Sequence, residues 1–232
     1  MGAHLSGTVD PGAPPDGATS AASLQFVRVI AITDRRRIVA PDLLAAGDWP
    51  AIAAAFGAAV ERAVAGCPAG SVVVQVREKD LDGGPLLALV RAARPFAPVL
   101  VNDRLDVALA ADAWGVHLPE RGLPIADARA LAPSLVLGVS RHAPGAVPAD
   151  LVQLGPIWPT PSKPGATPLG EAALAAPHGR AILVAVGGVD SPERAAAAAA
   201  AGADAVAVIR AAWAGASLAP LVAAVDAGRA RR

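Results

Sequence analysis

Short apolar runs recur along most of the chain at fairly regular intervals. Eight of them are nearly continuously apolar and rich in valine, and they lie at residues 27–33, 71–78, 98–103, 115–120, 135–140, 150–157, 181–189 and 204–211. An unbroken apolar run of this length is typical of a strand that is covered on both faces, as in a parallel sheet. The pattern therefore predicts eight buried strands.

Alanine-rich segments with helical spacing separate most of these runs, and examples are residues 48–66, 84–96 and 104–113. Strands that alternate with helices form a parallel sheet, and eight of them are the number that closes a (β/α)₈ barrel. An open, doubly wound sheet is the alternative, but it usually has fewer strands and a glycine-rich loop after the first one. Because "AITDRRR" follows the first run here, we predict the α/β class and a single-domain (β/α)₈ TIM barrel.

The two ends of the chain differ from the alternating region. Residues 1–24 are rich in Gly, Pro, Ala and Ser and lack the basic and apolar regions of a secretory signal, so a disordered tail is expected. Residues 227–232 end on arginines and are expected to be frayed. The barrel domain is therefore predicted to span residues 25–226.

Composition narrows the classes of partner. The 20 basic and 20 acidic residues cancel, which does not indicate the basic face of a nucleic-acid-binding protein. No apolar run reaches the roughly 18 residues of a membrane span. Cys67 is the only cysteine, so no internal disulfide can form, and a reducing, cytoplasmic setting fits. We expect small-molecule ligands, with no nucleic acid and no membrane partner, and a homo-oligomer stays open.

Polar residues gather at the C-terminal ends of the predicted strands, where barrels of this kind place their active sites. In "QVREK", strand alternation points Gln75, Arg77 and Lys79 to one side and Glu78 to the other. Two cations and an amide on one side suit a multiply charged anion, since arginine can bind phosphate oxygens in a bidentate manner. The alternative is a strand end with solvated charges.

Two further strand ends carry candidate ligand-binding groups. Asn102 and Asp103 end the third run, where a carboxylate beside a diphosphate commonly holds Mg²⁺, although the pair could also form a turn. Gly187 and Gly188 end the seventh run. They could let a phosphate approach backbone N–H groups closely, or they could serve close packing of helix and strand.

The segment "GPIWPTPSKPGATPLG" (residues 155–170) is a polar loop in a strongly apolar chain. It follows the sixth predicted strand and so faces the barrel mouth, which argues against a linker or a plain surface connection. His142, at the end of the fifth run, is a candidate proton shuttle or an ordinary loop residue. His117 lies inside a predicted strand and is expected to be a hydrogen-bonded structural histidine.

Six segments in order resemble the thiamine phosphate synthase/TenI family over about residues 27–212. They are "VQVREKD", "VNDRLDVALAADAWGVHL", "LGVSRH", "GPIWPTPSKPGATPLG", "VAVGGV" and "AGADAVAVI". The resemblance implies a (β/α)₈ barrel that handles thiazole phosphate. In the synthases, thiazole phosphate joins aminomethylpyrimidine diphosphate to give thiamine phosphate and pyrophosphate.

The resemblance also implies roles for particular residues. The pyrimidine diphosphate would be bound by Gln75, Arg77, Glu78, Lys79, Asn102, Ser140 and Lys163. The thiazole phosphate would be bound by Thr160, Pro161, Ser162, Gly187, Gly188, Ile209 and Arg210. Asp103 would bind Mg²⁺, the implied cofactor, and His142 and Lys163 are the candidate catalytic residues. The polar loop would be a lid that shields a pyrimidine carbocation from water.

The chain departs from the family pattern at the metal site. Synthases typically read "GVHLGQED", whose last residue is a second carboxylate for Mg²⁺, whereas this chain reads "GVHLPERG". Gly122 takes the place of that aspartate, and Glu120 is the nearest alternative, acting through water. Arg210 stands where serine is common. TenI-type thiazole tautomerases, which are isomerases, share the barrel, need no diphosphate metal site and use a histidine that matches His142. The sequence thus favours a synthase and leaves a tautomerase or a non-catalytic thiazole-phosphate binder open.

Overall fold

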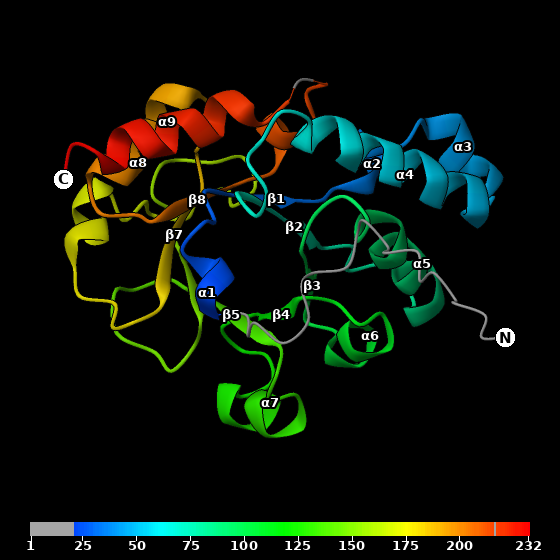
Figure 1. The fold of residues 1–232 in the computed structure, drawn as a ribbon, viewed down its shortest axis with the longest axis horizontal. Coiled ribbons are helices and arrows are strands. Elements are labelled where there is room, and N and C mark those ends of the chain that lie inside the picture. Colours follow the sequence, from blue (N-terminus) through cyan, green and yellow to red (C-terminus); the bar gives the residue numbers. More distant parts are fainter. Residues whose placement is uncertain (1–20, 216) are drawn as a thin grey trace, which may run out of the picture.

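The computed structural model describes residues 21–215 and 217–232, which form a closed barrel of eight parallel strands (Figure 1). The strands are β1 (Val29–Ile32), β2 (Val72–Val76), β3 (Val99–Asn102), β4 (Gly115–Leu118), β5 (Val136–Arg141), β6 (Leu151–Leu154), β7 (Ile182–Val186) and β8 (Ala205–Val208). Each strand pairs with the next, and β8 pairs with β1. The predicted (β/α)₈ barrel is confirmed, and the open sheet is excluded.

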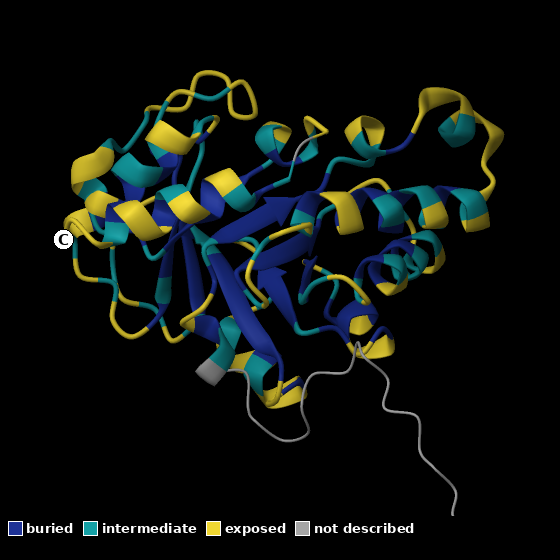
Figure 2. Cartoon of the chain, turned by 45° about the horizontal axis from the view of Figure 1, so that its top comes forward, coloured by how far each residue is buried: buried dark blue, intermediate teal, exposed yellow. Residues whose placement is uncertain are grey.

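Helices surround the barrel, and their outer faces are exposed while the strands are buried (Figure 2). They are α1 (Ala21–Leu24), α2 (Arg35–Ile38), α3 (Pro41–Ala46), α4 (Trp49–Val64), α5 (Gly83–Ala93), α6 (Leu105–Ala110), α7 (Ile125–Leu131), α8 (Pro192–Ala200) and α9 (Ala219–Arg229), with the 3₁₀ helices η1 (Glu171–Ala175) and η2 (Arg210–Trp213). Within the described part of the chain, no helix combines the length and the apolar character that crossing a membrane requires.

Side chains that point into the barrel change character along its axis. Near the N-terminal ends of the strands they form one buried apolar cluster, which includes Ile30, Val73, Leu100, Val136, Leu151 and Val184. Two residues further along, on the same face of their strands, the buried side chains are polar: Gln75, Asn102, His117 and Gln153. The apolar layer holds the strands together, and the polar layer above it forms the floor of a cavity.

Helices lie near both ends of the described chain. Residues 1–20 of the predicted tail lie outside the described residues. Residues 21–24, however, form the α1 turn, and Leu24 is buried in the apolar layer inside the barrel. At the other end, α9 continues to Arg229, and the Arg232 guanidinium donates to the Ala199 carbonyl (2.9 Å) and the Asp204 carboxylate (3.2 Å). The side chain of Arg232 therefore contacts the turn between α8 and β8, and the expected fraying of residues 227–232 stays a prediction.

Candidate active site

A cavity of about 350 Å³ opens at the C-terminal ends of the strands. Most of the residues predicted for the site line it: Gln75, Arg77, Lys79, Asn102, Ser140, His142, Thr160, Ser162, Lys163, Gly187, Gly188, Ile209 and Arg210. Among the described residues, three of the predicted site residues do not line the cavity: Glu78, Asp103 and Pro161. The structure thus brings together residues that are up to 135 positions apart in the sequence (Gln75 to Arg210).

The cavity floor is a chain of three amides from different strands. Gln153 Nε2 donates to Gln75 Oε1 (2.6 Å), and Gln75 Nε2 donates to Asn102 Oδ1 (3.2 Å). Because all three side chains are buried, these hydrogen bonds replace water and fix the orientation of each amide. We had not singled out Gln153 from the sequence, although the alternation in "DLVQL" places it on the interior face just as it does Gln75.

His117 is buried beside this floor, and its Nε2 lies 2.8 Å from Ser140 Oγ. Burial, assisted by the charge of Arg77, lowers the pKa of His117 to about 3. The imidazole is therefore neutral near pH 7. Gly138 makes room for it, since a Cβ there would lie 2.7 Å from His117 Nδ1. The predicted hydrogen-bonded structural histidine is confirmed.

Three cations line one wall of the cavity: Arg77, Lys79 and Lys163. Within residues 21–215 and 217–232, neither Arg77 nor Lys79 forms a salt bridge. Burial and the charges of Arg77 and Lys79 lower the pKa of Lys163. The charge of Glu120 opposes that shift. Three positive charges around one cavity suit a ligand with several negative charges.

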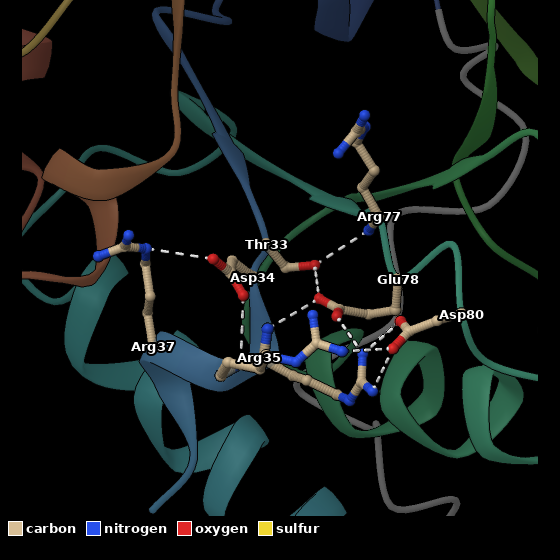
Figure 3. A network of polar contacts seen from close by, with 8 residues as sticks. Thr33, Asp34, Arg35, Arg37, Arg77, Glu78 and Asp80 are labelled. Carbon is tan, nitrogen blue, oxygen red and sulfur yellow. Dashed lines mark hydrogen bonds and ion pairs between the residues drawn. The ribbon is translucent and has the colours of Figure 1, made fainter. Parts of the chain in front are cut away.

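Glu78 faces away from the cavity, as strand alternation predicted (Figure 3). Its carboxylate accepts from the Thr33 hydroxyl (2.7 Å), from the Arg35 backbone N–H (3.0 Å) and from the Arg35 guanidinium (3.0 Å). The Thr33 hydroxyl oxygen also accepts from the Arg77 backbone N–H (2.9 Å), and Arg35 pairs with Asp80 (2.6 Å). Burial raises the pKa of Glu78, and these donors oppose that rise. The network anchors the β2–α5 loop to the β1–α2 turn and leaves the Arg77 side chain pointing the other way.

The polar loop, residues 155–170, is tied down at its stem. Ile157 N donates to Val186 O (3.0 Å) and Trp158 N to Gly187 O (3.1 Å), so the stem extends the sheet alongside β7. The end of the loop is also hydrogen-bonded to the stem, since Leu169 N donates to Pro156 O (2.8 Å). The tip between these anchors carries the cavity-lining groups Thr160, Ser162 and Lys163. We call residues 155–170 the lid.

Gly187 and Gly188 line the cavity, but the lid stem also requires them to be glycine. Their φ angles are +94° and +76°, in the region that side chains rarely adopt. A Cβ on Gly187 would lie 2.7 Å from Pro156 Cα, and one on Gly188 would lie 2.6 Å from Trp158 Cβ. Arg194 joins the same assembly: its guanidinium donates to Gly188 O (2.6 Å) and lies 5.6 Å from the centre of the Trp158 ring.

Glu120, His142 and Lys163 form an array at the cavity wall. The Glu120 carboxylate contacts His142 Nδ1, and Lys163 Nζ lies 2.7 Å from His142 Nε2. The hydrogen bond to His142 lowers the pKa of Glu120. Glu120 follows β4, His142 follows β5 and Lys163 belongs to the lid after β6, so three successive strand ends meet here. The sequence did not predict this contact.

The expected metal site has one carboxylate. Asp103 is exposed at the end of β3, and a Cβ added to Gly122 would lie 3.2 Å from Asp103 Oδ1. Position 122 therefore adjoins Asp103, and a glycine stands there. No group of three or more His, Cys, Asp or Glu side chains is arranged to hold a metal among the described residues. Mg²⁺ is often held by one or two carboxylates together with substrate phosphates, and Asp103 fits that kind of site.

Known proteins share much of this sequence. A family model described as thiamine monophosphate synthase matches residues 46–212. A putative thiamine-phosphate synthase of Geobacter sulfurreducens is 45% identical over 144 residues, which cover 57% of this chain and 60% of that protein. The thiamine-phosphate synthase of Gloeobacter violaceus is 39% identical over 73% of this chain and 50% of its own length. That of Chloroflexus aurantiacus is 40% identical over 66% of this chain and 76% of its own length.

Solved structures show the same fold. Thiamine phosphate pyrophosphorylase from Pyrococcus furiosus superposes with a TM-score of 0.60 at 26% identity, covering 90% of this chain and 96% of that one. A geranylgeranylglyceryl phosphate synthase from Thermoplasma acidophilum, at 14% identity and a TM-score of 0.55, shares the barrel alone. The family model matches well over half of the chain, and the matched range contains all the residues that line the cavity except Ile32. This chain belongs to the thiamine monophosphate synthase family.

Proposed function

We propose that this chain is a thiamine-phosphate synthase, a transferase that couples aminomethylpyrimidine diphosphate with thiazole phosphate and releases pyrophosphate. The observation that carries the proposal is a single cavity that holds two sets of groups suited to anions. Arg77, Lys79 and Lys163 line it together with Gly187, Gly188 and Arg210. A reaction between two phosphorylated molecules needs both sets.

The pyrimidine diphosphate would bind over the amide floor. Gln75, Asn102 and Ser140 offer hydrogen-bonding groups for the ring, while Arg77, Lys79 and Lys163 would neutralise the diphosphate. Glu78 would contribute indirectly from outside the cavity, because it fixes the Thr33 hydroxyl, which in turn accepts from the Arg77 backbone N–H. Asp103 would hold Mg²⁺, which when bound would add positive charge beside the diphosphate.

The thiazole phosphate would bind at the second set of groups. Its phosphate would meet backbone N–H groups around Gly187 and Gly188 and the charge of Arg210. The hydroxyls of Thr160 and Ser162, positioned through Pro161 in the lid, would complete the subsite. Apolar side chains also line the cavity and suit the face of an aromatic ring, namely Ile32, Val186, Ala207 and Ile209.

The geometry accounts for the chemistry of coupling. The bond between the pyrimidine methylene carbon and the diphosphate oxygen breaks, and the electron pair leaves with the diphosphate. After the diphosphate leaves, the methylene carbon carries a positive charge. The thiazole nitrogen then donates its lone pair to this carbon and forms the new bond. The cationic wall stabilises the departing diphosphate. The lid limits access by water, which would otherwise capture the cation.

A thiazole tautomerase, an isomerase, is the second candidate, and one observation favours it. His142 faces the cavity and is held between Glu120 and Lys163, as a proton-transferring histidine would be. That reaction requires no diphosphate, so a metal site with Asp103 as its single carboxylate would not limit it. A non-catalytic thiazole-phosphate binder is the remaining alternative.

One preparation assayed in two ways distinguishes these functions. A synthase releases pyrophosphate only when both substrates and Mg²⁺ are present, and chelator stops it. A tautomerase converts the thiazole carboxylate phosphate tautomer without pyrimidine, ignores chelator and loses roughly 100-fold in rate on His142→Ala. A binder shows neither turnover but melts at a higher temperature with thiazole phosphate. Absence of pyrophosphate at saturating Mg²⁺ with both substrates would rule out the synthase.

A further inference from the structure

Glu120 lines the cavity, yet the coupling chemistry described above gives it no role. Its side chain is 32% exposed, and the carboxylate has contacts on both oxygens. Oε2 contacts His142 Nδ1, and Oε1 lies 3.6 Å from Arg141 Nε. Both contacts come from the end of β5. The carboxylate is therefore directed across the cavity mouth towards β5.

A metal-binding role for Glu120 does not fit this placement. The position that adjoins the Asp103 carboxylate is Gly122, where a Cβ would lie 3.2 Å from Oδ1. A second metal-binding carboxylate belongs there, next to the first. Glu120 is instead directed to the neighbouring strand end, where one of its oxygen atoms contacts His142 and the other faces Arg141.

The tautomer of His142 follows from its contact with Lys163. The 2.7 Å between His142 Nε2 and Lys163 Nζ leaves room for one hydrogen between the two nitrogens. An ammonium group only donates, and Nε2 must therefore accept. The imidazole hydrogen then lies on Nδ1 and is donated to Glu120.

We infer that Glu120 is a positioning residue that acts through His142 to hold the Lys163 ammonium of the lid at the cavity wall. The lid then has two attachments. Its stem is bonded to β7 through Ile157 and Trp158, and its tip is held from β4 and β5 by the array. The carboxylate of Glu120 acts on the lid, and the metal depends on Asp103. The consequence for catalysis rests on the proposed synthase function.

The array itself is tested without substrate. In ¹⁵N-labelled protein, two-bond ¹⁵N–¹H correlations of the ring report which nitrogen of His142 carries the hydrogen. The parent should show the hydrogen on Nδ1, and Glu120→Ala should lose that fixed tautomer. Glu120→Gln should keep it, because the glutamine carbonyl can still accept from Nδ1. A parent His142 with its hydrogen on Nε2, or a tautomer unchanged in Glu120→Ala, would overturn the inference.

Steady-state pyrophosphate release then separates positioning from metal binding. Glu120→Ala should raise KM for the pyrimidine diphosphate about tenfold or more, since a charge-assisted contact is lost. It should leave the Mg²⁺ concentration for half-maximal rate unchanged. Glu120→Gln should stay within about threefold of the parent, whereas an amide cannot replace a metal-binding carboxylate. Glu61→Ala, an exposed carboxylate on α4, is the matched control and should match the parent.

Two outcomes remain distinguishable. A higher Mg²⁺ requirement in both Glu120 variants, with an unchanged His142 tautomer, would show that Glu120 binds the metal and would overturn the inference. If the parent releases no pyrophosphate, the proposed function fails, while the tautomer measurement still decides whether Glu120 positions His142.

Discussion

At the scale of single residues, His117 shows how the barrel interior sets the charge of a side chain. Its pKa is lowered to about 3 by burial and by the charge of Arg77. An unfolded histidine has a pKa near 6.5. Between these values the unfolded chain takes up a proton that the folded barrel does not, so His117 costs stability as the pH falls from about 6.5 towards 3.

Replacing His117 with asparagine should therefore flatten the dependence of stability on pH. One proton contributes up to about 1.4 kcal/mol per pH unit, so the parent should lose about 1 kcal/mol more than His117→Asn between pH 6 and pH 5. Urea unfolding at each pH measures the difference. The variant's lower absolute stability does not matter, because the slope is compared. Equal slopes would show that His117 is protonated in the folded protein.

Arg77 tests whether the cavity has two separate anion subsites. Its guanidinium lines the cationic wall, and a lost charge-assisted phosphate contact costs on the order of 1.5–3 kcal/mol. Arg77→Ala should weaken binding of the pyrimidine diphosphate about tenfold or more and leave thiazole phosphate binding nearly unchanged. Isothermal titration calorimetry with each ligand checks this, and equal losses for both would contradict separate subsites.

Gly122 tests the metal site. Gly122→Asp would place a carboxylate beside Asp103, and the neighbouring Pro119, whose Cδ would lie 2.9 Å from the new Cβ, would have to shift slightly. Without Mg²⁺ the two carboxylates repel, so the melting temperature should fall. With Mg²⁺ and pyrophosphate the variant should be stabilised more than the parent, at roughly tenfold lower Mg²⁺. Melting temperatures of the parent and the variant, measured over a series of Mg²⁺ concentrations, test this prediction. Identical dependence on Mg²⁺ would show that position 122 does not contribute to metal binding.

At the scale of elements, the lid stem and the loop after β7 form one packed unit. Two glycines with nearly equal backbone strain show what that packing contributes. Gly188 has a φ of +76° and Gly165, in the lid tip, a φ of +78°. A Cβ on Gly188 would lie 2.6 Å from Trp158 Cβ, whereas one on Gly165 would have nothing within 4 Å.

Gly165→Ala should therefore cost only the backbone strain, about 1–2 kcal/mol. Gly188→Ala should cost about 1–3 kcal/mol more, because the stem must move away from the loop. It should also weaken thiazole phosphate binding. Urea unfolding of the two variants, with calorimetry of the ligand, makes the comparison. Equal destabilisation would mean that the lid stem moves without cost and that Gly188 is required only for its positive φ.

The sequence predicted these elements well but not the contacts between them. All eight strands were correct, because runs of β-branched residues between alanine-rich segments have few other interpretations. Alternation correctly placed Gln75 and Arg77 towards the cavity and Glu78 away from it. Thr33 is 45 residues from Glu78 in the sequence, and His142 is 22 residues from Glu120. No local pattern indicates them, since they depend on which loops the closed barrel brings together.

The glycine pair shows the same limit. The sequence offered two reasons for Gly187 and Gly188, which were close approach of a phosphate and close packing of helix and strand. The structure adds the lid stem as a second neighbour. The apolar character of Leu24 alone likewise does not reveal that this side chain is buried in the apolar layer of the barrel.

At the scale of the whole molecule, the two ends of the barrel have different tasks. The N-terminal end is filled by apolar side chains that include Leu24 and Val27, and the C-terminal end holds the cavity. The polar floor comes from β2 to β6, while Ile32, Val186 and Ala207, from β1, β7 and β8, form the apolar side. Substitutions at the first end should act on stability, and those at the second on ligand binding.

The pairing of β1 with β8 joins Val29 to Val206, near opposite ends of the described chain. During synthesis on the ribosome, the first strand therefore waits for its last neighbour while most of the protein is made. Until β8 emerges, the incomplete sheet exposes two edges, which are open to pairing with other chains. The two subsites proposed here also draw on groups from β2 to the turn after β8. Ligand binding consequently cannot assist the early stages of folding, and it stabilises only a ring that has already closed.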